Sequence, residues 1–200
     1  MSIGKSIFEL SGKLGYTFRD ITLLENALTH SSYANEQRAR GINYPSNERL
    51  EFLGDAVLQL LISEHLYEAF AGRSEGVLTK MRQYLVCEKT LSRIARTLHL
   101  GDYLNVGHGE ELTDCRRRPK VLADALEALI AAIYLDSGNF ATVGARDVVF
   151  WNMSMPPRPS ARLTTWFPST TALQWTFTAK SVPKVPANAT SAEPAVSLII

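Results

Sequence analysis

The sequence of 200 residues has little cysteine, no apolar stretch of membrane-spanning length and no excess of either charge. Its two cysteines, Cys87 and Cys115, favour reduced thiols over a disulfide. No hydrophobic run reaches the roughly 20 residues that a transmembrane helix needs. The N-terminal stretch MSIGKSIFELSGKLGY carries Glu9 inside its only apolar patch, unlike a signal peptide. We therefore expect a cytoplasmic protein with no membrane attachment.

The charge balance argues against a globally basic nucleic-acid binder. The chain has 21 Lys and Arg residues against 20 Asp and Glu residues, a formal net charge of +1, so a nucleic-acid function would have to show in local patterns. Alternating apolar and polar residues, which mark strands, are also missing up to about residue 150, where helical spacing prevails. The sequence thus predicts an all-α domain over residues 1–152.

Capping and turn residues divide this domain into expected helices. Asp20 is placed to cap one helix, Ser46 or Asn47 a second, and Ser74 a long third segment. A connector rich in glycine follows at 101–119. The expected helical segments are residues 6–16, 21–33, 47–66, 75–100, 120–138 and 139–151.

Two of these segments, 47–66 and 120–138, are apolar on most sides yet carry carboxylates at helical spacing. Glu48, Glu51 and Asp55 stand at positions i, i+3 and i+7 and therefore share one face. Asp124 and Glu127, three positions apart, repeat the pattern on the second segment. Because buried, unpaired carboxylates are costly, helices that pack with these acidic faces together would need a cation.

The donor set indicates which cation this would be. Both segments offer carboxylates without cysteine or a Glu-x-x-His pair, which favours Mg²⁺, with Mn²⁺ as a possible substitute, over zinc or a di-iron centre. Magnesium sites of this kind keep several waters and often bridge to phosphates, so the pattern points to phosphodiester hydrolysis. Gly54 and the alanines at 123, 125 and 128 would let the two backbones approach. The competing interpretation is that these acids are solvated or pair with Arg49 and other bases.

Several segments in the same order resemble the ribonuclease III family. NERLEFLGDAVL at 47–58 resembles the family signature, and VLADALEALIAAIYLDSG at 121–138 resembles its second acidic helix. Three further segments also match family markers: ALTHSSYANE at 27–36, SEGVLTKMRQYLV at 74–86 and LGDYLNVGHGEE at 100–111. The resemblance covers roughly residues 5–150 and implies the helical endonuclease-domain fold of that family.

The resemblance also implies an activity and roles for six acids. It implies a Mg²⁺-dependent endoribonuclease that cleaves double-stranded RNA as a homodimer and processes precursors of ribosomal, messenger and transfer RNA. Attack by water rather than by the ribose 2′-hydroxyl would leave 5′-phosphate ends. By motif position, the metal ligands are Glu51, Asp124 and Glu127, the catalytic residues are Asp55 and Glu127, and the additional acids of the cleft are Glu48 and Glu75.

Other residues carry less specific signals. His30 is either a hydrogen-bonded structural histidine or a metal or RNA contact. The structural role is favoured because no second histidine lies at the spacing of a metal-ligand pair. Phe52 is a core residue by sequence pattern alone, whereas the resemblance favours a dimer contact. A set of basic residues either forms solvated faces or holds RNA phosphates. This set is Lys80, Arg82, Lys89, Arg93, Arg96, Arg116, Arg117, Arg118 and Lys120.

The last part of the chain, residues 153–200, departs from the family. It is rich in Pro, Ser, Thr and Ala, which predicts disorder, and it shows no recognisable double-stranded-RNA-binding domain. We interpret it either as the tail of a shortened enzyme or as the product of a frame slip near residue 150. Two rival functions stay open: a non-catalytic duplex-RNA binder that kept the fold, and an unrelated all-α metallohydrolase acting on small phosphate esters.

Overall fold

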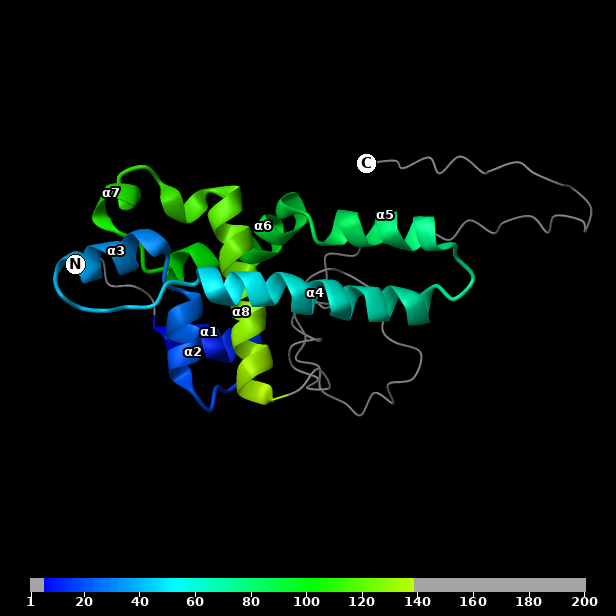
Figure 1. Ribbon diagram of the computed structural model, residues 1–200, viewed down its shortest axis with the longest axis horizontal. Coiled ribbons are helices and arrows are strands. Elements are labelled where there is room, and N and C mark those ends of the chain that lie inside the picture. The colour runs from blue at the N-terminus through cyan, green and yellow to red at the C-terminus, as the bar shows by residue number, and fades with distance from the viewer. Residues whose placement is uncertain (1–5, 139–200) are drawn as a thin grey trace, which may run out of the picture. The chain divides into compact units, whose positions relative to one another are not determined.

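A computed structural model describes residues 6–138, and within this range the chain is helical and contains no β-strand (Figure 1). One isolated bridge joins Thr29 to Asn105. The helices are α1 (Ile7–Leu14), α2 (Ile21–Ala27), α3 (Ser31–Ala39), α4 (Glu48–Ala69), α5 (Glu75–Leu85), α6 (Glu88–Thr97), α7 (His108–Glu111) and α8 (Pro119–Ser137). Two short 3₁₀ turns, η1 (Leu100–Tyr103) and η2 (Cys115–Arg117), lie in the connector before α8. The predicted all-α fold class is confirmed.

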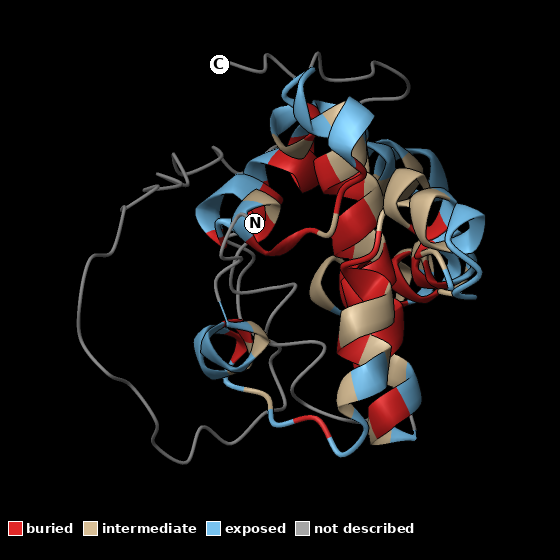
Figure 2. Cartoon of the chain, turned by 90° about the vertical axis from the view of Figure 1, so that its left-hand side faces the viewer, coloured by how far each residue is buried: buried red, intermediate tan, exposed pale blue. Residues whose placement is uncertain are grey.

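The core is built around α8, which crosses α4 and also packs on α6 and α2 (Figure 1). Pro119 occupies the first turn of α8 and Gly138, at φ 81°, ends it in the left-handed conformation. Between these ends the helix is apolar on most sides, and such a helix is stable only when neighbours cover it from several directions, as α4, α6 and α2 do here. Leu126, Leu129 and Ile133 are almost completely buried there. Figure 2 shows that the buried residues lie on the helix faces that pack against one another, and that the exposed residues lie on the outer faces.

The N-terminal helices partly confirm the expected segments. Asp20 caps α2 as predicted, since its side chain accepts a hydrogen bond from the N–H of Thr22. The prediction of one helix over 21–33 is wrong, because the chain breaks between α2 and α3. At the break the N–H of His30 donates to the carbonyl of Asn105, and the N–H of Asn105 donates to that of Leu28. A connection to a distant segment therefore replaces the local helical hydrogen bonds.

The prediction of a continuous helix over 75–100 is also wrong. Helix α5 ends at Leu85, and Cys87 adopts an extended conformation before α6 begins. The hydroxyl of Thr90 donates to the carbonyl of Tyr84 at 2.9 Å, which satisfies an acceptor that the broken helix leaves open. Ser74 stands at the N-cap position of α5 without a side-chain capping bond.

Three further expectations concern the chain as a whole. No helix among residues 6–138 is long and apolar enough to cross a membrane. Cys87 and Cys115 are both free thiols, as predicted. The expected helix over 139–151 and the predicted tail over 153–200 lie outside the described residues.

Candidate active site between α4 and α8

The two acidic helices approach closely at one glycine. Gly54 of α4 lies against the main chain of Glu127 in α8, where a β-carbon would overlap the Glu127 carbonyl oxygen. Ala125 and Ala128 of α8 are fully buried. The small residues thus permit the close backbone approach that the sequence predicts, and this approach brings the acidic side chains of both helices to one side.

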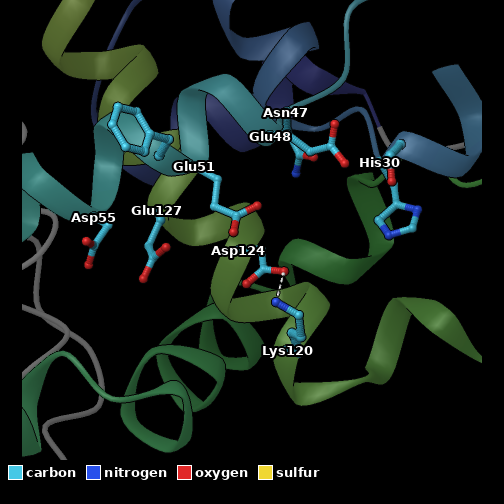
Figure 3. Close-up of a pocket in the computed structure, with 10 residues that line it drawn as sticks. His30, Asn47, Glu48, Glu51, Asp55, Lys120, Asp124 and Glu127 are labelled. Carbon is cyan, nitrogen blue, oxygen red and sulfur yellow. Dashed lines mark ion pairs between the residues drawn. The ribbon is translucent and has the colours of Figure 1, made fainter.

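Beside this contact lies a cleft of about 660 Å³, into which the predicted acids project (Figure 3). Glu51 and Asp55 extend from α4, and Asp124 and Glu127 extend from α8 toward the same space. The lining residues are His30, Ser31, Asn47, Glu48, Glu51, Phe52, Asp55, Lys120, Asp124 and Glu127. Four of the six acids singled out from the sequence therefore converge, and Glu48 joins them at the start of α4.

The convergence of like charges changes the proton affinity of the site. Burial, followed by repulsion from Asp55, Asp124 and Glu51, raises the pKa of Glu127 from its usual 4.5 to about 8. Burial and the charge of Asp124 also raise the pKa of Glu51, although Lys120 acts in the opposite direction. Raised carboxyl pKa values in a cleft indicate negative charge that the protein itself leaves poorly compensated.

Few polar partners compensate this charge. Asp55 accepts from the Gln59 amide at 3.1 and 3.2 Å, and Glu48 accepts from the Ser46 hydroxyl at 2.9 Å. Lys120 pairs with Asp124 at 3.3 Å and is the only Lys or Arg among the residues that line the cleft. Arg49 does not line it. The interpretation that bases neutralise the acids therefore holds for one of them only.

The donor set fits a magnesium ion. Carboxylate oxygens are the ligands that Mg²⁺ prefers, and the ion usually needs only one or two of them because it retains several waters. Within residues 6–138, no three His, Cys, Asp or Glu side chains are arranged so that together they could hold a metal ion. An open cleft with poorly compensated carboxylates matches a partly hydrated ion better than a caged one.

His30 has the structural role that the sequence favours. It is the N-cap of α3: its Nδ1 accepts from the N–H of Ser32 at 3.2 Å and lies 2.8 Å from the Ser32 hydroxyl. The ring also borders the cleft. Ser31 and Asn47 also line the cleft but were not predicted as site residues. Asn47 was expected only as a helix cap, although its position directly before the acidic helix was an available signal.

Two other candidates lie differently from the four converging acids. Glu75 is exposed at the start of α5, where it accepts from the Thr79 hydroxyl at 2.7 Å and lines a separate hollow between α4 and α5. Its membership of an acidic cleft stays a prediction, because a single chain does not bring it to the other acids. Phe52 is 82% exposed at the edge of the acidic cleft, so the interpretation as a core residue is wrong.

The basic run 116–118 is largely engaged within its own segment. Arg116 pairs with Glu111 at 2.8 Å and donates to the carbonyls of Gly101 and Leu104. The other two arginines face acids of the same connector: Arg117 pairs with Asp114 at 3.8 Å and Arg118 with Glu110 at 2.9 Å. These contacts organise the connector before α8, which weakens the case for a free phosphate-binding patch there.

Comparison with known proteins places this arrangement in a family. The family model described as Ribonuclease-III-like matches residues 20–150. A protein named Ribonuclease 3 from Desulforamulus reducens is 56% identical over 129 residues, which are 64% of this chain and 52% of the relative. Another Ribonuclease 3, from Geobacillus kaustophilus, is 52% identical over 135 residues, 68% of this chain and 54% of the relative. The chain thus spans about half the length of the curated relatives that it matches.

Solved structures agree with the sequence relatives. The nuclease domain of ribonuclease III from Campylobacter jejuni, described for flexibility in a region involved in dimer formation, has a TM-score of 0.66. It is 41% identical, and the match covers 74% of this chain and 96% of that domain. On the match of the family model and the identity to these relatives, the chain belongs to the ribonuclease III family.

Proposed function

We propose that this chain carries the nuclease site of a Mg²⁺-dependent endoribonuclease that hydrolyses double-stranded RNA. The observation that supports this most is the convergence of Glu51, Asp55, Asp124 and Glu127, from two crossing helices, on one cleft. Relatives named Ribonuclease 3 at 52–56% identity add support over the matched half of their length.

The four converging acids divide two tasks in the proposed reaction. Glu51, Asp124 and Glu127 would hold the metal, with Mn²⁺ as a possible substitute for Mg²⁺. When bound, the ion supplies Lewis acidity, which lowers the pKa of water and neutralises charge on the phosphate. Asp55 lies near Glu127 and is steadied by Gln59, so its carboxylate is placed to orient the attacking water and accept its proton. Attack by water leaves a 5′-phosphate and a 3′-hydroxyl.

The proposal includes a homodimer. The exposed Phe52 ring borders the cleft, and such a large exposed aromatic side chain suits an interface. The related Campylobacter jejuni domain is described with a region involved in dimer formation. In the proposed dimer each subunit contributes one acidic cleft, so both strands of a duplex are cut, and Glu75 of one subunit supplements the acids of the other. The proposed substrates are cytoplasmic precursors of ribosomal, messenger and transfer RNA.

A cleavage assay on a long end-labelled RNA duplex tests the proposal. We expect cleavage with Mg²⁺, none in EDTA, and products whose 5′ ends carry phosphate. Replacing Glu127→Gln removes a carboxyl group from the proposed metal ligands and should abolish cleavage while duplex binding, measured by mobility shift, persists. The control Glu68→Gln changes an exposed acid of α4 that does not line the cleft, and should cleave normally.

The outcomes separate the rival functions. Cleavage by Glu127→Gln at the wild-type rate would contradict the proposed site. Duplex binding without cleavage by the wild-type chain in Mg²⁺ would indicate the non-catalytic RNA binder. Hydrolysis of aryl phosphates with no action on the duplex would indicate the small-ester metallohydrolase.

A further inference from the structure

Lys120 stands in the acidic cleft as its single Lys or Arg side chain (Figure 3). It follows Pro119 in the first turn of α8, and its ammonium reaches Asp124 one turn later at 3.3 Å. The Lys120 side chain is 75% exposed, whereas that of Asp124 is 25% exposed. The pair therefore joins a largely exposed cation to a mostly buried carboxylate of the proposed metal site.

The position of Lys120 is unfavourable for its own helix. A positive charge in the first turn lies at the positive end of the helix dipole, where acids are the stabilising residues. The compensating attraction comes mainly from the cleft, which five carboxylates line and where Asp124 and Glu51 act on the ammonium; Glu88, which does not line the cleft, adds to it. Consistently, the charges of Asp124 and Glu51 raise the pKa of Lys120. Lys120 in turn acts to lower the pKa of Glu51 and of Glu127, although burial and the other carboxylates keep both values raised.

We propose that Lys120 is an internal counter-ion of the cleft, which holds Asp124 while no metal is bound and must release it when a divalent cation binds. Lys120 therefore weakens metal binding and stabilises the metal-free protein. This inference rests on the proposed metal site. Release is easy because the side chain is largely exposed, so the ammonium regains water when it leaves Asp124.

The effect on affinity follows from simple electrostatics. An ion pair at this exposure contributes about 0.2–1 kcal/mol, and its loss makes Asp124 available and the cleft more negative. We expect Lys120→Met to lower the dissociation constant for a divalent cation by about 1.4- to 5-fold, the factor that corresponds to this pair energy. Lys120→Arg keeps the charge and should bind the metal as the wild-type chain does.

Mn²⁺ is the practical probe, because the electron paramagnetic resonance signal of the free ion reports binding without RNA or turnover. The full chain, stripped with EDTA and dialysed, is titrated with Mn²⁺, and Mg²⁺ then competes for the site. Lys80→Met serves as the matched control, since it removes the same charge from an exposed position of α5 that does not line the cleft. Thermal unfolding in EDTA and in Mn²⁺ is a second readout, in which Lys120→Met should be less stable without metal and gain more from it.

Each result decides a different point. Tighter Mn²⁺ binding by Lys120→Met, but not by Lys120→Arg or Lys80→Met, supports the inference. Unchanged or weaker binding by Lys120→Met overturns it while the metal site stands. Equal tightening by Lys80→Met overturns it as well, because the effect would then be a general one of net charge. If the wild-type chain does not bind Mn²⁺, or if Mg²⁺ does not displace the bound Mn²⁺, the proposed metal site and this inference are overturned together.

Discussion

Tyr16 and Asp136 are 120 positions apart in the sequence, yet the Tyr16 hydroxyl donates a 2.7 Å hydrogen bond to the Asp136 carboxylate. The same carboxylate accepts the main-chain N–H groups of Arg19 at 3.0 Å and Asp20 at 2.7 Å. The segment that leads into α2 is thereby tied to the last turn of α8. Burial alone would raise the pKa of Asp136, but the hydrogen bonds from Arg19 and Asp20 outweigh it and the pKa is lowered.

Asp136→Ala should therefore destabilise the fold. It leaves two main-chain donors without their acceptor, which costs about 1–3 kcal/mol for a partly buried group. Urea unfolding at neutral pH measures the loss, with Gln83→Ala at an exposed position of α5 as a control that should stay within about 0.5 kcal/mol of wild type. Because the folded-state pKa of Asp136 is lowered, its contribution is lost as the pH falls through that value. The gap between wild type and Asp136→Ala should then narrow in acid, and a gap that widens would contradict this account.

Gly54→Ala tests the contact that brings the acidic helices together. The added β-carbon meets main-chain atoms of Glu127 rather than a flexible side chain, so α4 and α8 must separate. We expect a loss of about 1–3 kcal/mol in the free energy of unfolding and weaker divalent-metal binding, because the carboxylates move apart. Gly12→Ala in α1, where a β-carbon meets nothing within 4 Å, is the control and should be neutral or stabilising. Equal stability of the two variants would contradict the close contact.

The metal-free protein should lose stability as the pH rises. The folded-state pKa of Glu127, about 8, lies above its usual 4.5, so the folded chain keeps a proton that the unfolded chain releases. Stability contributed by this proton is complete below about pH 4.5 and is lost as the pH rises through about 8. In EDTA, the advantage of Glu127→Gln over wild type should grow between pH 5 and pH 8. Parallel unfolding midpoints across this range would contradict the raised pKa.

Truncation of Phe52 should weaken the dimer, whereas truncation of Leu58 should lower the stability of the monomer. Phe52 is 82% exposed, so Phe52→Ala should leave monomer stability nearly unchanged but raise the dissociation constant of the proposed dimer by about tenfold or more. Leu58 is fully buried on the same helix, and Leu58→Ala should cost about 2–5 kcal/mol of stability. Sedimentation velocity and urea unfolding separate the two effects. A dimer of Phe52→Ala as tight as wild type would remove Phe52 from the interface.

Features that depend on local spacing could be predicted from the sequence. Glu48, Glu51 and Asp55 share a face because the period of one helix fixes their directions. The bounds of α8 follow from Pro119 at its start and Gly138 at its end. Such signals act within one or two helical turns, so residues near in the sequence suffice to determine them.

Only the tertiary structure decided features that join distant segments. The helix breaks at Thr29 because main-chain groups of the neighbouring residues bond to Asn105 instead of to their own helix. No residue between 21 and 33 predicts this break. Phe52 is a residue type that usually lies in the core. It is exposed here because no other helix of the described chain covers that face of α4.

The sequence by itself determined that two apolar helices carry acidic faces. That these faces open on one cleft, with Lys120 among them and Glu75 elsewhere, was decided by how α4 and α8 cross at Gly54. The physical reason is that a helix period fixes the direction of a side chain relative to its own axis. The relative placement of two axes depends instead on packing between residues more than 70 positions apart, 54 and 127 here.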